Sequence, residues 1–230
     1  MIRINDLCQP IGPAVPAWQP CPLPEPVVLE GTRVRLEPID STHVGAIRSV
    51  LAPRPELWTY LREDPPGDEA TALALVERLR QGPNVTFAVI RLADQSFQGR
   101  VTVMRADPVH GTVEIGSIIY SPELQRTPVT TEVAHLIADH VFELGYRRLE
   151  WKCDSLNQPS RRAAARLGFT EEGTHRNAVV YKGRSRDTTW FSITDTEWPR
   201  IRSAHRRWLD PRNFDADGRQ RTTLGEQLSR

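Results

Sequence analysis

The order of segments between residues 112 and 155 constrains the fold more than any other feature of this chain. TVEIGSIIYS (112–121) and RRLEWKCDS (147–155) have the composition of strands, and a helix is expected between them over residues 128–145. A strand–helix–strand unit makes a right-handed crossover, which sets its two strands side by side in parallel. The chain therefore needs a sheet with a parallel pair and a helix on its face.

Short, turn-rich connections precede this unit. Residues 93–96 and 107–111 join three strand candidates, which are TFAVIRL (86–92), FQGRVTVMRA (97–106) and 112–121. Connections of this length join antiparallel neighbours, so the three strands predict a meander. Together with the parallel unit, the meander predicts a mixed sheet in which most neighbours are antiparallel.

Other segments complete the expected fold. Helices are expected over 42–52, which Asp40 or Ser41 can cap, over 68–82 and over 158–167, and strands are expected within 27–40 around Gly31, near 176–182 and near 187–194. We therefore predict an α/β chain of the α+β type, with a mixed, mostly antiparallel central sheet and helices on both faces. A chain of 230 residues is long enough for one such domain with appendages.

Both ends of the chain differ in composition from its middle. Residues 9–26 carry seven prolines, which exclude a helix or a central strand, so residues 1–26 are expected to form an extended arm. Trp18 suggests that the arm packs on the domain expected over 27–198, and a loose leader is the alternative. The arginine-rich segment 199–230 is expected to form a helix and tail, with an amphipathic helix over WPRIRSAHRRWL (198–209).

The sequence argues against nucleic acid, membranes and metal ions as partners. Acidic residues interrupt the arginines of the C-terminal segment and no aromatic ladder accompanies them, so a nucleic-acid or ribosome-bound role is only a minor alternative. No apolar run of about 18 residues could span a membrane, and we recognise no signal peptide. Cys8, Cys21 and Cys153 lack the spacing of metal ligands, which favours reduced thiols, a cytoplasmic protein and no metal.

The turn QRTPVTT, residues 125–131, stands where α/β proteins often bind phosphate, between a strand and a helix. The first amide groups of a helix are unpaired and carry partial positive charge, which attracts anions. Pro128 suits the first helical position but removes one donor, which Arg126 could offset by a charge-assisted contact. Thr130 and Thr131 add hydroxyl groups. On these residues alone, the turn either binds phosphate or only starts the helix.

In their order along the chain, the motifs around this turn resemble those of the GNAT superfamily of N-acetyltransferases, and most closely its RimJ/RimL branch. Gln125 matches the first position of the family's pyrophosphate loop, (Gln/Arg)-x-x-Gly-x-(Gly/Ala), while Pro128 and Thr130 replace both small residues. The other matches are Ile115-Gly116 in the fourth core strand, Glu132 after the loop, Asn157 and Ser160, and Leu167-Gly168-Phe169. The resemblance covers residues 28–198.

The resemblance implies a V-shaped splay between the fourth and fifth core strands, and a binding mode for acetyl-CoA or another acyl-CoA. The pantetheine arm would pair with the backbone of residues 118–120, and the pyrophosphate would lie on the amides of the turn. The residues expected to bind the coenzyme are Ile118, Ile119, Tyr120, Gln125, Arg126, Thr127, Val129, Thr130, Thr131, Asn157, Ser160 and Arg161.

Acyl transfer from a thioester to an amine requires a base for the amine and an acid for the departing thiolate. By resemblance, Ser160 is the acid, because Ala164 stands where many members have the tyrosine that protonates the sulfur; the alternative is that Ser160 only caps a helix. Glu114 is our candidate base, because period-two alternation would place it on the side of Gly116 and Ile118. The alternative for Glu114 is an ion pair with an arginine of a neighbouring strand.

Aromatic and histidine side chains are candidates for the acceptor pocket. The residues expected to bind the acceptor are Trp58, Tyr60, His175 and Tyr181. Core packing is the alternative for Trp58 and Tyr60. Cys153 lies on an expected buried strand, so we expect it to pack rather than to act as a nucleophile.

These observations predict an acyl-CoA-dependent N-acyltransferase that uses acetyl-CoA. Its acceptor would be a primary amine, of a protein N-terminus or a small molecule, which attacks the thioester directly in a ternary complex. The alternative is a non-catalytic GNAT-fold module that binds a ligand or a partner. The sequence leaves the oligomeric state open, with a homodimer as one option.

Overall fold

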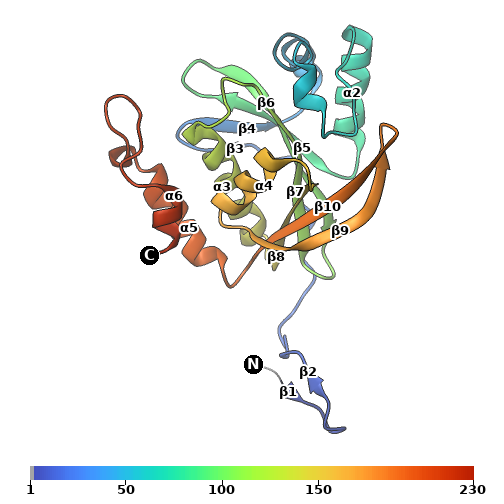
Figure 1. The fold of residues 1–230 in the computed structure, drawn as a ribbon, viewed down its shortest axis with the longest axis vertical. Coiled ribbons are helices and arrows are strands. Elements are labelled where there is room, and N and C mark those ends of the chain that lie inside the picture. The colour runs from blue at the N-terminus through green and yellow to red at the C-terminus, as the bar shows by residue number, and fades with distance from the viewer. Residues whose placement is uncertain (1–2) are drawn as a thin grey trace.

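The computed structural model describes residues 3–230 and contains an eight-stranded sheet with helices on both faces (Figure 1). The order of strands in the sheet is β3-β4-β5-β6-β7-β8-β10-β9. Their bounds are β3 (Leu29–Glu30), β4 (Val34–Pro38), β5 (Val85–Arg91), β6 (Ser96–Asp107), β7 (Thr112–Tyr120), β8 (Arg148–Asp154), β9 (Thr170–Tyr181) and β10 (Arg184–Thr194). The pair β7–β8 is parallel and the others are antiparallel, so the predicted meander and crossover are confirmed.

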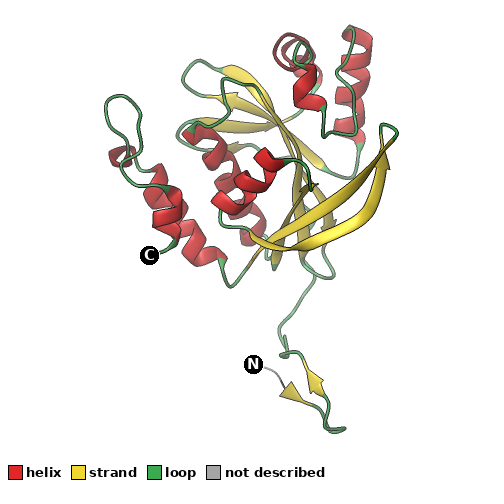
Figure 2. Ribbon diagram, viewed as in Figure 1, coloured by secondary structure: helices red, strands yellow, loops and turns green. Residues whose placement is uncertain are grey.

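The helices divide between the two faces of the sheet (Figure 2). Their bounds are α1 (Val44–Ala46), α2 (Glu69–Gln81), α3 (Pro128–Glu143), α4 (Gln158–Arg166), α5 (Trp198–Leu209) and α6 (Leu224–Leu228). Apolar side chains of α3 to α6 form one core with the sheet, and those of α1 and α2 form a second core on the opposite face. The predicted mixed sheet with helices on both faces is therefore confirmed.

The helix expected over 42–52 is not one regular α-helix. A 3₁₀ turn (Ser41–His43) precedes α1, and a π-helical segment (Ile47–Leu51) follows it. Asp40 caps the start, as expected, because its Oδ1 accepts a hydrogen bond from Thr42 N at 2.9 Å. In the π-helical segment Ala52 N donates to Ile47 O, five residues back, which is a hydrogen-bond register that an α-helical sequence period does not reveal.

The edge strand β9 begins at Thr170, earlier than the strand expected near 176–182. Its first residues, TEEGTH, contain two glutamates and a glycine and are all exposed. An edge strand with solvent on its faces needs no alternation of apolar residues, so the sequence offered no strand signal there.

The parallel pair β7–β8 holds together over only part of its length. Its register runs from Thr112 opposite Arg148 to Ile115 opposite Trp151. Beyond this point no further pair between the two strands is found within residues 3–230, and the strands diverge. This divergence is the V-shaped splay predicted between the fourth and fifth core strands.

A β-bulge in β7 lies where the splay opens. The register shifts so that Ser117, with a φ of +50°, and Ile118 together face one residue of β6. The fully buried Arg100 donates from Nη1 to the Ser117 carbonyl at 3.1 Å. Because of the extra residue, Ile118 packs toward the α3 side and Ile119 toward the α2 side. The expectation that Ile118 shares a side with Glu114 is therefore wrong.

The N-terminal arm contacts the rest of the chain through Trp18. Its Nε1 donates to Val109 O at 2.9 Å, and its ring occupies the space in which a Cβ at Gly111 would lie. The structure thus agrees with a packed arm from Trp18 onward. Before it, β1 (Arg3–Ile4) and β2 (Pro10–Ile11) form a separate two-stranded hairpin below the main sheet in Figure 1.

The arginine-rich C-terminal segment is part of the fold. Helix α5 has the predicted bounds and buries Trp198, Ile201 and Trp208 in the core that α3 also lines. Its arginines find partners within the molecule: Arg202 contacts Asp139 and Glu143 of α3, and Arg207 donates to Gln227. No helix among the described residues is long and apolar enough to cross a membrane.

Candidate active site

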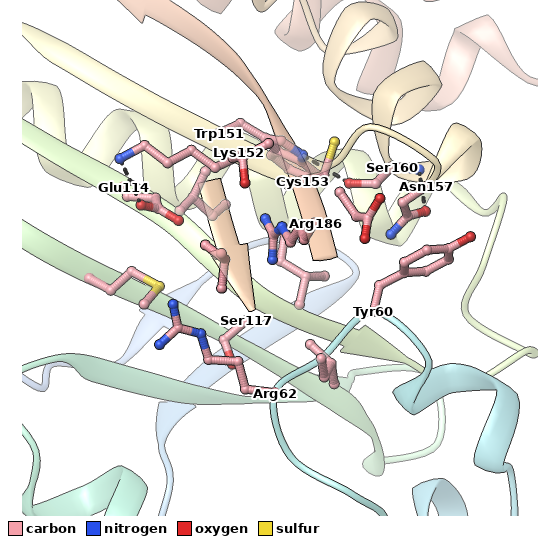
Figure 3. A pocket seen from close by; sticks show the side chains of 18 of the residues that line it. Tyr60, Arg62, Glu114, Ser117, Trp151, Lys152, Cys153, Asn157, Ser160 and Arg186 are labelled. Carbon is pink, nitrogen blue, oxygen red and sulfur yellow. Dashed lines mark hydrogen bonds and ion pairs between the residues drawn. The ribbon is translucent and has the colours of Figure 1, made fainter. Parts of the chain in front are cut away.

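A cavity of about 580 Å³ opens where β7 and β8 diverge (Figure 3). Met104 and Arg105 of β6 line it together with four other segments: the loop before α2, the bulged part of β7, the end of β8 with the start of α4, and the β9–β10 hairpin. Of the predicted site residues, the cavity brings together Tyr60, Glu114, Ile118, Asn157, Ser160 and His175. These residues come from all four segments, so only the folded sheet assembles the site.

Asn157 and Ser160 form the start of α4. Asn157 Oδ1 accepts a hydrogen bond from Ser160 N at 3.1 Å, which caps the helix. Trp151 Nε1, on β8, donates to Ser160 Oγ at 3.0 Å. Because the oxygen accepts this bond, the hydroxyl proton of Ser160 remains free to be donated to another group. The side chain that caps α4 is thus that of Asn157, and the alternative that Ser160 only caps the helix is wrong.

Cys153 lies beside Ser160 and is 5% exposed. Burial raises the pKa of the Cys153 thiol, and the nearby Ser160 hydroxyl offsets this only in part. The thiol is therefore neutral at physiological pH, which agrees with a packing role for Cys153 even though it also lines the cavity.

Glu114 is buried in β7 and forms two ion pairs through one oxygen. Its Oε2 lies 2.7 Å from Arg105 Nη1 of β6 and 3.2 Å from Lys152 Nζ of β8. The alternative of an arginine partner on a neighbouring strand is thus what the structure contains. Its other oxygen, Oε1, has no hydrogen bond to another described residue and lies 3.0 Å from the position of a Cβ on Gly116. That oxygen remains free for a ligand.

The start of α3 carries the predicted phosphate-binding turn. Pro128 occupies the first helical turn as expected, and among the described residues no side chain caps the helix. Thr127 Oγ1 and Thr130 Oγ1 donate back to main-chain carbonyls, at 2.7 and 2.9 Å, and so leave the first amides of the helix uncovered. Arg126 is exposed, with a φ of +62°. The turn does not line the cavity described above.

Other predicted coenzyme-binding residues already have partners in the protein. Gln125 Nε2 donates to Tyr120 O at 3.1 Å, which ties the turn to the end of β7. Thr131 is buried and its Oγ1 accepts from Arg166 of α4 at 2.9 Å. Arg161 pairs with Glu171 at 3.0 Å. The side chains of these residues therefore hold the turn and α4 in place.

Two of the predicted acceptor-binding residues lie away from the cavity. Trp58 is fully buried in the α2-side core, and its Nε1 donates to Leu51 O at 3.0 Å, so the core-packing alternative describes it. Tyr181 is 8% exposed and its hydroxyl donates to Asp154 Oδ2 at 2.9 Å. Burial and this hydrogen bond raise the pKa of Tyr181. Neither side chain lines the cavity, so neither meets an acceptor there.

Several residues that line the cavity were not predicted from the sequence. Among them are Arg62, Lys152, Asp154, Arg186, Thr188 and Trp190. Residues 186, 188 and 190 alternate along β10, which indicates one shared face. The side chains of β10 line the cavity together with those of β8 because Thr188 pairs with Asp154 and Trp190 pairs with Lys152. This pairing cannot be predicted from a single sequence. No group of three or more potential metal ligands was found within residues 3–230.

Comparison with known families gives a match over residues 33–170. The matching model is that of the acetyltransferase (GNAT) domain. This range runs from the start of β4 to the start of β9 and includes the bulged β7, the start of α3 and the start of α4.

Individual relatives agree with this match. A solved GCN5-related N-acetyltransferase from Brucella melitensis is 42% identical, has a TM-score of 0.89 and covers 93% of this chain and 99% of its own. The Bacillus subtilis protein YdaF, provisionally named a ribosomal N-acetyltransferase, is 24% identical over 170 residues, which are 71% of this chain and 90% of that protein. RimL, a ribosomal L7/L12 α-N-protein acetyltransferase, is 20% identical with a TM-score of 0.64, over 73% and 94% of the two chains, and shares the fold.

Proposed function

Because this chain belongs to the acetyltransferase (GNAT) family, in its RimJ/RimL-like branch, we propose that it transfers an acetyl group from acetyl-CoA to a primary amine of a protein N-terminus or a small molecule. The relatives named as ribosomal N-acetyltransferases support a protein amine as the acceptor. The transfer would proceed by direct attack of the amine while both substrates are bound.

The observation that carries this proposal is an uncapped helix start beside a split sheet. The first amides of α3, at Val129 and Thr130, can bind the pyrophosphate of acetyl-CoA, because a helix N-terminus attracts anions. The β7 edge from Ile118 to Tyr120, which does not pair with β8, can bind the amide groups of the pantetheine arm. The thioester would then enter the cavity beside Ser160.

The residues of the cavity can serve the individual steps of the transfer. A backbone amide of β7 near the Ser117 bulge would polarise the thioester carbonyl. Glu114 Oε1 would accept a proton of the amine, directly or through water, and the new bond between nitrogen and carbon would replace the bond between carbon and sulfur. The sulfur would take the proton of the Ser160 hydroxyl, whose oxygen Trp151 holds in position, and water would return a proton to Ser160 as Glu114 releases the one it accepted.

Two measurements test the proposal. Acetyl-CoA should raise the melting temperature, because it binds only the folded chain, and thiol should be released when amines are added. Ser160→Ala should lower kcat roughly 100-fold, the range of one general acid, with little change in the melting temperature. Ser155→Ala, on the loop before α4 and outside the cavity lining, is the matched control.

Several outcomes would contradict the proposal. A melting temperature that does not change at millimolar acetyl-CoA would exclude both the enzyme and a coenzyme-binding module. A clear shift without thiol release from any amine would favour the non-catalytic module, which the replacement of both loop glycines by Pro128 and Thr130 keeps as the second candidate. Equal losses of kcat and stability in Ser160→Ala would make the Ser160 hydroxyl a structural acceptor for Trp151 Nε1 and not a proton donor.

A further inference from the structure

The face of β10 that lines the cavity carries three buried polar atoms without partners. Among the described residues, Arg186 Nε, Thr188 Oγ1 and Trp190 Nε1 make no hydrogen bond, and the Thr188 side chain belongs to a residue only 6% exposed. Buried polar groups in folded proteins are nearly always hydrogen-bonded. Three exceptions at alternate positions of one strand, all beside one cavity, indicate that a ligand supplies their partners.

The charges around the cavity indicate the sign of that ligand. Each carboxylate that lines it already has a partner: Glu63 lies 3.6 Å from Arg100, Glu114 pairs with Arg105 and Lys152, and Asp154 accepts from Tyr181.

By contrast, Arg186 and Arg62 form no ion pair and no side-chain hydrogen bond within residues 3–230. The two side chains line the same cavity from different segments, Arg62 from the loop before α2 and Arg186 from β10 (Figure 3). An indole N–H and a guanidinium only donate hydrogen bonds, and a hydroxyl can do so. The missing partner is therefore an acceptor with negative charge.

From this geometry we propose that the amine acceptor carries a carboxylate, which Arg186 binds with the help of Arg62. The proposal rests on the function proposed above and specifies its substrate class. A planar guanidinium matches a carboxylate through two parallel hydrogen bonds. Thr188, two residues after Arg186, lies opposite Asp154 on β8, and Arg186 and Ser160 line the same cavity, so a carboxylate at Arg186 shares the cavity with the reacting centre.

A carboxylate close to the reacting amine can come from two kinds of acceptor. One is a small amino acid, and the other is a protein N-terminus with an acidic residue close to its amine. The experiment compares pairs of acceptors with and without the carboxylate, at equal concentrations of the unprotonated amine. Alanine and alaninamide represent the first source, and the peptide amides Ser-Asp-Ala and Ser-Asn-Ala represent the second.

The kcat/KM for each acceptor is measured at saturating acetyl-CoA with the full chain. The acid form of at least one pair should be preferred by roughly tenfold or more, as expected for a hydrogen-bonded charge pair. In Arg186→Gln and in Arg62→Gln this preference should fall toward one, while the KM for acetyl-CoA stays unchanged. Arg176→Gln, an exposed arginine of β9 outside the cavity lining, should keep the preference.

A preference that survives both substitutions, or equal rates for the acid and neutral forms in the unaltered protein, would overturn the proposal. Absence of thiol release with all four acceptors would count against the enzyme instead. In that case the melting temperature is measured with each acceptor. A shift with the acid forms that is lost in Arg186→Gln supports the carboxylate site without turnover, and equal shifts or no shift with either form exclude it.

Discussion

At the scale of single residues, Asn157 and Ser160 use different atoms for structure and for the proposed chemistry. The Asn157 side chain and the Ser160 amide form the cap of α4, whereas Ser160 Oγ faces Trp151 and the cavity. The sequence left Ser160 as a helix cap or a proton donor, and in the structure the capping side chain is that of Asn157. Arg126 differs from these residues, because its exposed side chain has no partner among the described residues and is available to a ligand.

Reversing the charge of Arg126 tests its contact with the coenzyme. Arg126→Glu should raise the Kd for acetyl-CoA roughly tenfold, because a charge-assisted hydrogen bond to phosphate is lost and repulsion replaces it. Titration calorimetry at low and high salt measures this, and the effect should shrink as salt screens it. Arg3→Glu makes the same charge change in the separate N-terminal hairpin. An affinity equal to that control would remove Arg126 from the binding turn.

At the scale of secondary-structure elements, one carboxylate joins α3 to the β3–β4 turn. Glu132 Oε1 accepts from Thr32 N at 3.0 Å, and Oε2 accepts from Arg33 N at 2.7 Å. A Cβ on Gly31 would lie only 2.7 Å from this carboxylate, so the turn must pass close to it. Glu132 is 4% exposed, and its carboxylate accepts the hydrogen bonds of turn amides that have no main-chain acceptor.

Removing this carboxylate should destabilise the protein rather than impair coenzyme binding. We expect Glu132→Ala to lower the free energy of unfolding by about 2–4 kcal/mol, because two partly buried amides lose their charged acceptor. Chemical denaturation measures the change. Glu143→Ala, also on α3 but with a side chain that is 68% exposed, should cost less than about 1 kcal/mol. Similar costs for the two variants would contradict the structural role of Glu132.

Most helices and strands could be predicted from the sequence, whereas features that depend on distant residues could not. Helices α2, α3, α4 and α5 and the meander follow from periodicity, caps and short turns, so their bounds were predicted to within about two residues. The β7 bulge was missed, because it depends on Arg100, a buried cation of another strand that bonds the Ser117 carbonyl. Trp58 was placed at the acceptor because an aromatic residue in a loop has no local signal of burial.

At the scale of the whole molecule, α5 supports α3 through a buried histidine. His205 Nε2 lies 2.9 Å from Leu167 O, at the end of α4, and its ring lies 5.6 Å from that of His135 in α3. Burial lowers the pKa of His205 to about 4, although the bond to Leu167 O works in the opposite direction. The neighbouring charges of Arg166 and Asp139 also act on it, with opposite signs.

This burial predicts how stability depends on pH. Between pH 6.5 and about 4 the unfolded chain protonates His205 and the folded chain does not, so the free energy of unfolding falls as the pH falls. From pH 7 to pH 5 the loss should be about 2 kcal/mol from this residue. Denaturation at a series of pH values measures the slope, which His205→Gln should reduce. A slope that is unchanged in this variant would assign the acid sensitivity to other groups.

The interrupted pairing of β7 and β8 has a consequence for what the protein can admit. Past Ile115 and Trp151, two strand edges face each other inside the sheet rather than at its rim. The exposed edge of a sheet can pair with a strand of another protein chain, but here each edge lies inside one continuous sheet. A thin, extended molecule with amide groups of its own can bind between β7 and β8 and form hydrogen bonds with the two strand edges. The sheet would then be complete only during a catalytic cycle, and each release of product would reopen it.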